Sequence, residues 1–273
     1  MLMTRYFLNR CVITIILLLG TTFHASAQTA DEYLKAGEKK FENKAYKEAL
    51  IDYDKAILLN PKSIEAYNAK GSCLYELEQF KKAAEAYGSI INLDSTNAEA
   101  YNKRGVCYVL GPFRLRAAMQ DFTKAIYLDP DDIKPYYNRG LLRNRGRGSE
   151  CAIGDFTAIL MIDSTNANIW ISRGNSFKKT KQFSAAILDY TIAINEDAPD
   201  KMLAYFNRGV CNETIEKHDQ AAKDFDVVLM LAKSKPGNTA YSKQPMQLKR
   251  LHRKAKKIIK KAYPKDTQWE FVI

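Results

Sequence analysis

Glycine recurs through most of this chain at a nearly constant interval. The intervals are 34, 34, 35, 34 and 35 residues, and the glycines are Gly37, Gly71, Gly105, Gly140, Gly174 and Gly209. A period of this length is typical of proteins that repeat one supersecondary unit along the chain. Such a unit cannot bury its apolar surface alone. The period therefore excludes a single closed core and predicts a stack of units that stabilise one another.

Three further positions repeat with the glycine. An aromatic ring stands four residues before it, at Tyr33, Tyr67, Tyr101, Tyr136, Trp170 and Tyr205. An alanine follows it by 12 or 13 residues, at Ala49, Ala83, Ala118, Ala152, Ala186 and Ala221. A second ring follows the alanine by four residues, at Tyr53, Tyr87, Phe122, Phe156, Tyr190 and Phe225. Spacings of three and four residues share one helix face, so each unit is predicted to be two closely packed helices.

This combined pattern resembles the tetratricopeptide repeat. On that resemblance the repeats occupy residues 28–233, as six units at about 30–63, 64–97, 98–132, 133–166, 167–201 and 202–233. The family implies an all-α fold, a right-handed α-solenoid of helix-turn-helix hairpins.

The N-terminal segment, residues 1–27, has the three parts of a secretory signal peptide. A basic start precedes an apolar run at 11–19, and Ala-Ser-Ala at 25–27 forms a cleavage site. The run is shorter than the ~20 residues of a membrane-spanning helix. We expect cleavage after Ala27 and an exported protein, periplasmic or associated with the cell envelope, with secretion as an alternative. An uncleaved anchor or a buried first helix is the other interpretation.

The mature chain would contain four cysteines, Cys73, Cys107, Cys151 and Cys211. Three of them stand two residues after a repeat glycine, which is the same position in three units. Equivalent positions in neighbouring hairpins are expected about 8–10 Å apart, whereas a disulfide needs Cα atoms within ~7 Å. We therefore expect free thiols.

No catalytic or cofactor motif occurs in the sequence. It has three histidines, no phosphate-binding glycine loop, no His-Glu-x-x-His and no nucleophile elbow. Cysteine and histidine do not cluster at metal-ligand spacing. The sequence predicts a protein that is not an enzyme and carries no cofactor.

Charged residues also recur at fixed positions of the repeat. A base precedes five of the glycines, at Lys70, Arg104, Arg139, Arg173 and Arg208. An aspartate precedes five of the second rings, at Asp52, Asp121, Asp155, Asp189 and Asp224. Asp52 has only Ala36 at the matching position of its own unit, so we predict that each base pairs with the preceding unit. The predicted pairs are Asp52 with Lys70, Asp121 with Arg139, Asp155 with Arg173, and Asp189 with Arg208. Pairing within a unit is the alternative.

The resemblance also implies that the first helix of each unit lines a concave groove. At the positions that face the groove in this family, units one to three carry acids and units four and five carry bases. The candidate partner-binding residues are Asn68, Asn102, Val106, Tyr137, Leu141, Ile171, Lys178, Phe206 and Val210. Packing between neighbouring first helices is the alternative for the apolar ones. A lysine directly after the first ring, which the family uses to clamp acidic C-terminal tails, is absent here.

Of the net charge of +11, two charges come from Arg5 and Arg10 in the N-terminal segment and nine from the C-terminal segment, 234–273. Ten bases and no acid lie between Lys243 and Lys265. We predict a linker, a helix at 246–263 whose apolar stripe caps the last repeat, and a tail. The basic face of that helix is a candidate for contact with an anionic surface through Lys249, Arg250, Arg253, Lys254, Lys256, Lys257, Lys260 and Lys261.

Two hypotheses follow for function. The first is an exported, non-catalytic scaffold that binds a protein or peptide in its groove. The alternative is a cell-envelope adaptor that contacts an anionic surface through its basic C-terminal helix. Nucleic acid is not expected as a partner, because the excess of bases is confined to one segment.

Overall fold

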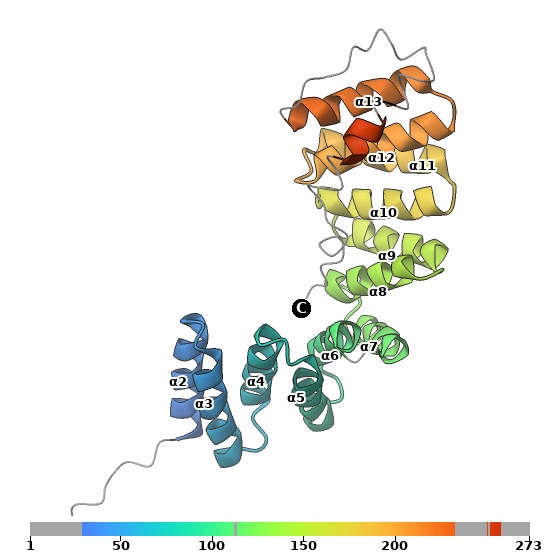
Figure 1. The fold of residues 1–273 in the computed structure, drawn as a ribbon. Coiled ribbons are helices and arrows are strands. Elements are labelled where there is room, and N and C mark those ends of the chain that lie inside the picture. Colours follow the sequence, from blue (N-terminus) through green and yellow to red (C-terminus); the bar gives the residue numbers. More distant parts are fainter. Residues whose placement is uncertain (1–28, 112–113, 233–249, 251, 258–273) are drawn as a thin grey trace, which may run out of the picture. The chain divides into compact units, whose positions relative to one another are not determined.

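A computed structural model of the chain describes residues 29–111, 114–232, 250 and 252–257. The predicted signal peptide, the predicted linker and the predicted tail lie outside these residues. All regular structure in the described residues is helical (Figure 1). The chain divides into two compact units, residues 1–77 and 78–273.

The described part of the first unit consists of the helices α2 (Ala30–Glu42), α3 (Tyr46–Leu59) and α4 (Ile64–Glu76). Successive helices pack against each other, α2 on α3 and α3 on α4. The buried centre of the unit contains Ala49, Tyr53 and Cys73, with Leu34, Phe41, Tyr46, Leu50 and Ala69 packed against it. The repeat alanine and the second ring therefore lie in the core, as their spacing predicts.

The second unit continues the same alternation of helices. They are α5 (Phe80–Leu93), α6 (Ala98–Leu110), α7 (Leu115–Leu128), α8 (Ile133–Arg145), α9 (Ser149–Ile162), α10 (Ala167–Lys179), α11 (Phe183–Asn195), α12 (Lys201–Thr214) and α13 (His218–Leu231). The even-numbered helices, here called first helices, carry the repeat glycines, and the odd-numbered ones are second helices. Each helix packs on the next, and first helices also contact one another, as α6 with α8 and α10 with α12. The chain is an all-α solenoid of consecutive hairpins, as predicted.

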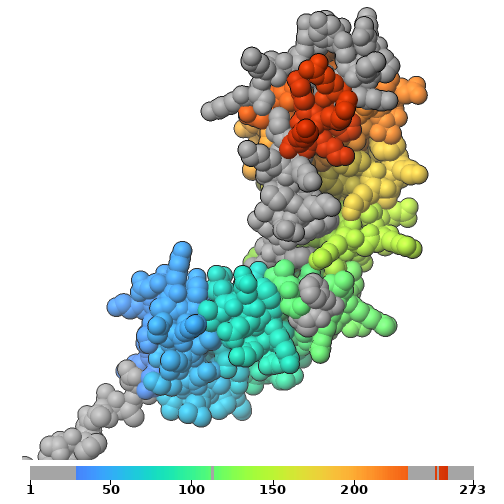
Figure 2. Space-filling model, in the orientation of Figure 1, coloured from blue at the N-terminus to red at the C-terminus, as the bar shows by residue number. Residues whose placement is uncertain are grey.

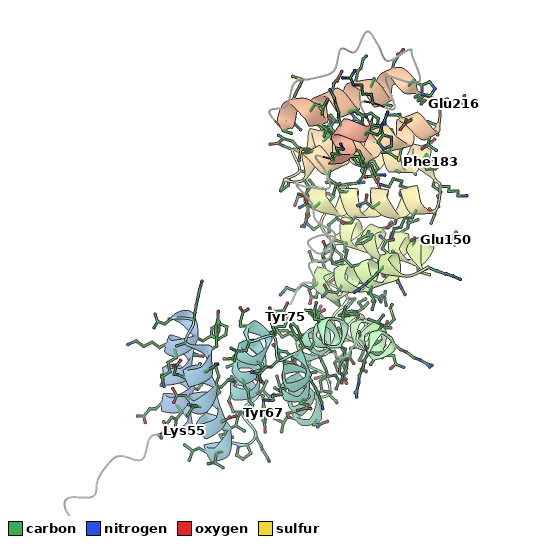
Figure 3. The ribbon with its side chains drawn as sticks, in the orientation of Figure 1. Lys55, Tyr67, Tyr75, Glu150, Phe183 and Glu216 are labelled. Atoms are coloured by element: carbon green, nitrogen blue, oxygen red, sulfur yellow. The ribbon has the colours of Figure 1, made fainter. Side chains whose placement is uncertain are left out.

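Short polar side chains start the first helices. The capping residues whose side-chain oxygens accept a backbone N–H of the first turn are Thr29, Ser63, Asn97, Asp132 and Asn166. Such caps satisfy donors that have no partner within the helix. Figure 3 labels Glu150, Phe183 and Glu216 at the turns within three successive hairpins, and these turns lie along the same edge of the second unit.

The repeat glycine lets the two helices of a hairpin approach closely. A Cβ atom built on Gly174 would lie 2.8 Å from Cε1 of Tyr190, a separation that real Cβ atoms do not tolerate. The Tyr190 ring cannot move aside easily, because it is fully buried and its hydroxyl donates to Asn175 Oδ1 at 2.8 Å. On the second helix α9, by contrast, a Cβ atom built on Gly154 would meet nothing within 4 Å.

These two glycines give opposite predictions for the same substitution. Gly174→Ala should lower the free energy of unfolding by roughly 1–3 kcal/mol, because it overpacks the contact with Tyr190. Gly154→Ala should raise it by up to about 1 kcal/mol, because alanine is the better helix former at an open position. Urea denaturation of both variants beside the wild type checks the pair. A loss of equal size in both would contradict the close-approach explanation.

The described part of the C-terminal segment packs on the last hairpin. The His252 ring stacks on Phe225 at a centroid distance of 5.2 Å, and His252 Nδ1 lies 2.7 Å from Glu213 Oε2. Ala255 is fully buried in the cluster that includes Phe206 and Phe225. Figure 2 shows the described part of the C-terminal segment, in red, on the surface of the second unit. The other residues of the predicted apolar stripe lie outside the described residues.

Free thiols are confirmed for the described cysteines, Cys73, Cys107, Cys151 and Cys211. Burial raises the pKa of Cys107 to about 12, and burial is also the main cause that raises the pKa of Cys73 and Cys211 to about 11. Cys151 alone among the four is exposed. A raised thiol pKa leaves little thiolate, the reactive form, at neutral pH.

Thiol labelling should therefore separate one cysteine from the other three. At pH 8 the native protein is expected to react quickly with a disulfide reagent at Cys151, and to react at the buried thiols only after global unfolding. Mass spectrometry after timed labelling checks this point. Rapid labelling of Cys107 in the native protein would show that this thiol is not buried.

The raised pKa values also mean that the native state holds these protons more tightly, so the free energy of unfolding should fall as pH rises above about 9.

Candidate functional site

The surface with most of the candidate residues is formed by the first helices of the second unit, α6, α8, α10 and α12. We call it the first-helix face. Of the candidate partner-binding residues, Asn68 alone lies outside it, because this half-buried residue is on α4 of the first unit. The remaining candidates are carried by these four helices, and each can be compared with its expected role.

Most of the apolar candidates belong to the core. The exposed fractions are 0% for Val106, 5% for Leu141, 3% for Ile171 and 9% for Phe206. Leu141 and Ile171 belong to the buried clusters of successive hairpins, together with the second rings Phe156 and Tyr190. The expected role of these four in partner contact is therefore corrected. They fill the space between neighbouring helices, which was the alternative interpretation.

Tyr137 and Val210 are partly buried. Tyr137 packs against Phe156, with ring centroids 6.2 Å apart in an edge-on arrangement. Val210 packs against the cluster of the last hairpin. Both residues therefore support the core and keep part of their side chains at the surface.

Side-chain amides link successive first helices across this face. Asn138 Nδ2 donates to Asn102 Oδ1 at 2.9 Å, joining α8 to α6. Asn207 Nδ2 donates to Asn175 Oδ1 at 2.9 Å, joining α12 to α10. The sequence analysis selected Asn102 and missed the other three. The signal was available, because Asn138 and Asn207 both stand two residues after the first ring of their units.

A further amide joins α8 to α10. Asn144 Nδ2 donates to Ser176 Oγ at 2.7 Å, and both side chains are buried. Asn144 Oδ1 is buried and, among the described residues, accepts no hydrogen bond. A buried acceptor without a donor is destabilising. This oxygen is therefore an unfavourable feature within the contact between α8 and α10.

Lysine side chains lie among these amides. Lys178 Nζ donates to Asn207 Oδ1 at 2.6 Å, and Lys179 Nζ donates to the backbone oxygen of Asn144. Burial lowers the pKa of Lys178 and of Lys179. Loss of hydration thus disfavours their charged forms, and a nearby anion would favour them. Lys178 is the one candidate cation of the sequence analysis that the structure places within the amide row.

Lys103 adds a buried ammonium group that the sequence analysis overlooked. The residue is 7% exposed, and its Nζ lies 2.7 Å from Glu99 Oε1. It also lies 5.8 Å from the centroid of the Tyr87 ring. Together, Lys103, Lys178, Lys179 and the amides give the first-helix face a polar, mainly cationic strip.

The arginine–aspartate pairing differs from the prediction. Each arginine pairs with the aspartate of its own hairpin, as Arg104–Asp121 at 2.8 Å, Arg139–Asp155 at 2.7 Å, Arg173–Asp189 at 2.9 Å and Arg208–Asp224 at 2.7 Å. Nearer the N-terminus, Asp52 of α3 pairs with Lys40 of α2 at 2.5 Å. Lys70 of α4 pairs with Asp54 of α3 at 2.6 Å. For the four arginines the prediction of pairing with the preceding repeat was wrong, whereas Lys70 does pair with the preceding repeat, at Asp54 and not at Asp52. The reason is the close approach at the repeat glycine, which brings the flanking arginine next to the aspartate of the same hairpin.

The remaining guanidinium nitrogen of three of these arginines forms a hydrogen bond with the preceding hairpin. Nη1 donates to a threonine hydroxyl of the preceding second helix, with Arg139 on Thr123 at 3.0 Å, Arg173 on Thr157 at 3.2 Å and Arg208 on Thr191 at 3.0 Å. Each of these arginines therefore ties its own hairpin together and also holds it to the previous one. This row is a structural feature of the stack.

The described part of the basic C-terminal segment packs against α12, where the ring centroids of His252 and Phe206 are 5.8 Å apart. Within the described segment, Arg250, Arg253, Lys254, Lys256 and Lys257 are exposed. The other candidates for an anionic surface, Lys249, Lys260 and Lys261, lie outside the described residues. Within the described ranges, no helix is long and apolar enough to cross a membrane, and no three metal-ligand side chains gather.

Comparison with curated proteins gives partial likenesses. Over 79 residues, which are 28% of this chain, the sequence is 33% identical to DnaJ homolog subfamily C member 7 of Mus musculus. The match covers 16% of that protein's length.

Solved structures share the fold. A tetratricopeptide repeat protein from Parabacteroides merdae is similar with a TM-score of 0.64 and 17% identity, over 87% of this chain and 94% of that one. YrrB, a tetratricopeptide repeat protein with an unusual peptide-binding site, is similar with a TM-score of 0.58 and 20% identity, over 75% of this chain and 97% of its own. Models of the tetratricopeptide repeat match residues 64–97, 98–132 and 171–239. These matches and the stacked hairpins agree, and the chain belongs to the tetratricopeptide repeat family.

Proposed function

We propose that this protein is a non-catalytic scaffold that binds an extended segment of a partner protein on its first-helix face. The observation that carries the proposal is the polar strip in which Lys178 and Lys179 lie among the amides of α8, α10 and α12. Side-chain amides can hydrogen bond to an extended peptide backbone, which has both donors and acceptors. The peptide-binding site of YrrB, a protein with the same fold, supports this type of partner.

The charge of the strip selects the kind of segment. Burial lowers the pKa of both lysines, so their positive charges are incompletely hydrated. A partner carboxylate would replace the missing hydration and form a charge-assisted hydrogen bond. The proposed ligand is therefore an extended peptide that carries acidic residues.

A peptide-display selection against the mature protein tests this proposal. The affinity of a selected peptide is measured by fluorescence anisotropy for the wild type and for the double variant Lys178→Gln/Lys179→Gln. We expect the double variant to bind at least ten-fold more weakly, since charged hydrogen bonds are each worth about 1.5–3 kcal/mol. Lys223→Gln is the matched control, because Lys223 is an exposed lysine on the second helix α13. Equal affinity in the double variant and the control would reject the first-helix face as the binding site.

The C-terminal segment supports a second candidate function. Its Ala255 is buried on the last hairpin while Arg253, Lys254, Lys256 and Lys257 are exposed. Such a segment can cap the stack and present its bases to an anionic surface at the same time. Sedimentation with phosphatidylglycerol vesicles should then exceed sedimentation with phosphatidylcholine vesicles, and the difference should fade in high salt. Equal sedimentation with both vesicles would remove this candidate.

We also propose that the protein works outside the cytoplasm, in the periplasm or cell envelope. The three-part pattern at residues 1–27 supports export. The exported protein is expected to begin at Gln28. N-terminal sequencing of the native protein tests this, and a start at Met1 would reject cleavage.

A further inference from the structure

The row of arginines has one member whose surroundings differ. Arg104 binds Asp121 through Nε and Nη2, both at 2.8 Å, as the other arginines bind their aspartates. No threonine hydroxyl accepts a hydrogen bond from its Nη1, because Gly88 stands at the corresponding position of α5. Within the described residues, Arg104 donates hydrogen bonds through Nε and Nη2 only.

The missing side chain leaves a hollow beside Arg104. A Cβ atom built on Gly88 would have one neighbour within 4 Å among the described residues, Arg104 Nη1 at 3.8 Å, so the guanidinium borders open space. The same helix has Ala86 where other second helices carry the aspartate of the row. The hollow is a pocket of about 320 Å³, and its lining includes Lys81, Glu85, Arg104, Tyr108 and Arg114. None of the residues of the polar strip lines it.

The pocket presents cations in a fixed arrangement. The Tyr108 ring contacts two guanidinium groups, with the Cζ atoms of Arg104 and Arg114 each 5.8 Å from its centroid. The backbone N–H of Arg114 donates to the Tyr108 backbone oxygen at 3.0 Å, which holds the two residues together. Arginine on an aromatic face keeps its N–H edges available for an anion.

The charges of the lining are unbalanced. Asp121 compensates Arg104, which leaves Lys81 and Arg114 against Glu85. Among the ion pairs formed by the described residues, none includes Lys81 or Arg114. An anionic group in the pocket would therefore meet a free guanidinium, a free ammonium and the unused Nη1 donors of Arg104.

We propose that the pocket between α5 and α6 binds the carboxylate group of an acidic ligand. A carboxylate is planar and accepts hydrogen bonds from guanidinium edges in the geometry that arginine offers. It would occupy the place that Thr123, Thr157 and Thr191 occupy beside the other arginines, and would complete the hydrogen bonding of Arg104. This site is separate from the first-helix face and does not depend on peptide binding there.

Titration of the mature protein with glutarate, followed by calorimetry, tests the proposal. Gly88→Thr supplies the missing hydroxyl and fills the space, so it should weaken glutarate binding at least about ten-fold. Arg114→Gln should weaken it by a similar factor, and Glu85→Gln should strengthen it because a repelling charge is removed. Arg116→Gln is the matched control, because Arg116 is an exposed arginine two residues further along. Thermal melts should show that all four variants are folded.

Several outcomes would overturn the proposal. These are the absence of glutarate binding to the wild type, unchanged binding in Gly88→Thr, or equal losses in Arg114→Gln and Arg116→Gln. Inorganic phosphate, titrated in parallel, should bind more weakly than glutarate; tighter phosphate binding would replace the carboxylate by a phosphoryl group and reject the proposal as stated. A peptide with a single glutamate separates a protein-borne carboxylate from a free diacid. Binding of either at the pocket supports the carboxylate site.

Discussion

Asp155→Asn should lower the free energy of unfolding by about 3–5 kcal/mol, the range measured when one partner of a buried ion pair is removed. Asp155 is 3% exposed and accepts hydrogen bonds from Arg139 Nη2 at 2.7 Å and from Arg143 Nη1 at 2.6 Å. The amide keeps the size of the side chain and removes the charge that both guanidinium groups face. Urea denaturation at neutral pH measures the loss.

A matched exposed pair provides the control. Asp54 lies 2.6 Å from Lys70 Nζ, but its side chain is 58% exposed. Asp54→Asn should therefore change stability by no more than about 1 kcal/mol, because solvent screens an exposed pair. If the two aspartates prove equally dispensable, the row of pairs contributes nothing to the stack.

Ile171→Ala should lower the free energy of unfolding by about 2–5 kcal/mol, as buried large-to-small substitutions do. Ile171 is 3% exposed and lies in the cluster that contains Tyr190 and Ala204. The effect on binding of a selected peptide should be small under conditions in which the variant remains folded. Thermal melts measured beside anisotropy separate stability from affinity.

Leu188→Ala is the control for this substitution, because Leu188 lies on the second helix α11 and is 61% exposed. It should leave stability nearly unchanged. If Ile171→Ala instead weakened peptide binding and left stability intact, Ile171 would return to the partner-contacting surface and its assignment to the core would be wrong.

The prediction for Ile171 changes the expected source of affinity. With Val106, Leu141 and Phe206 also in the core, few large apolar side chains of the candidate set remain for a partner. Binding on the first-helix face then depends on amides and lysines, whose hydrogen bonds select extended, acidic segments. Salt should weaken such binding partially, because Lys179 is exposed to solvent whereas Lys178 is half-buried.

The sequence by itself determined the repeating architecture. Glycine, alanine and two rings recur at helical spacing, and this local information is enough to define two helices and their contact face in every unit. It was also enough to predict free thiols, because Cys73, Cys107 and Cys211 share one position of the repeat. Properties that depend on position within one unit were therefore predictable.

Only the tertiary structure decided how neighbouring units share their side chains. Spacing places Arg139 on a helix face, but the pairing with Asp155 depends on how closely two helices approach, which the pattern does not give. The same holds for Ile171, which could face a partner or the next helix, and for Gly88, whose missing side chain matters only because Arg104 of the next hairpin lies beside it. Helical periodicity specifies the direction of a side chain around one helix axis, whereas burial and pairing depend on the distance and rotation between axes.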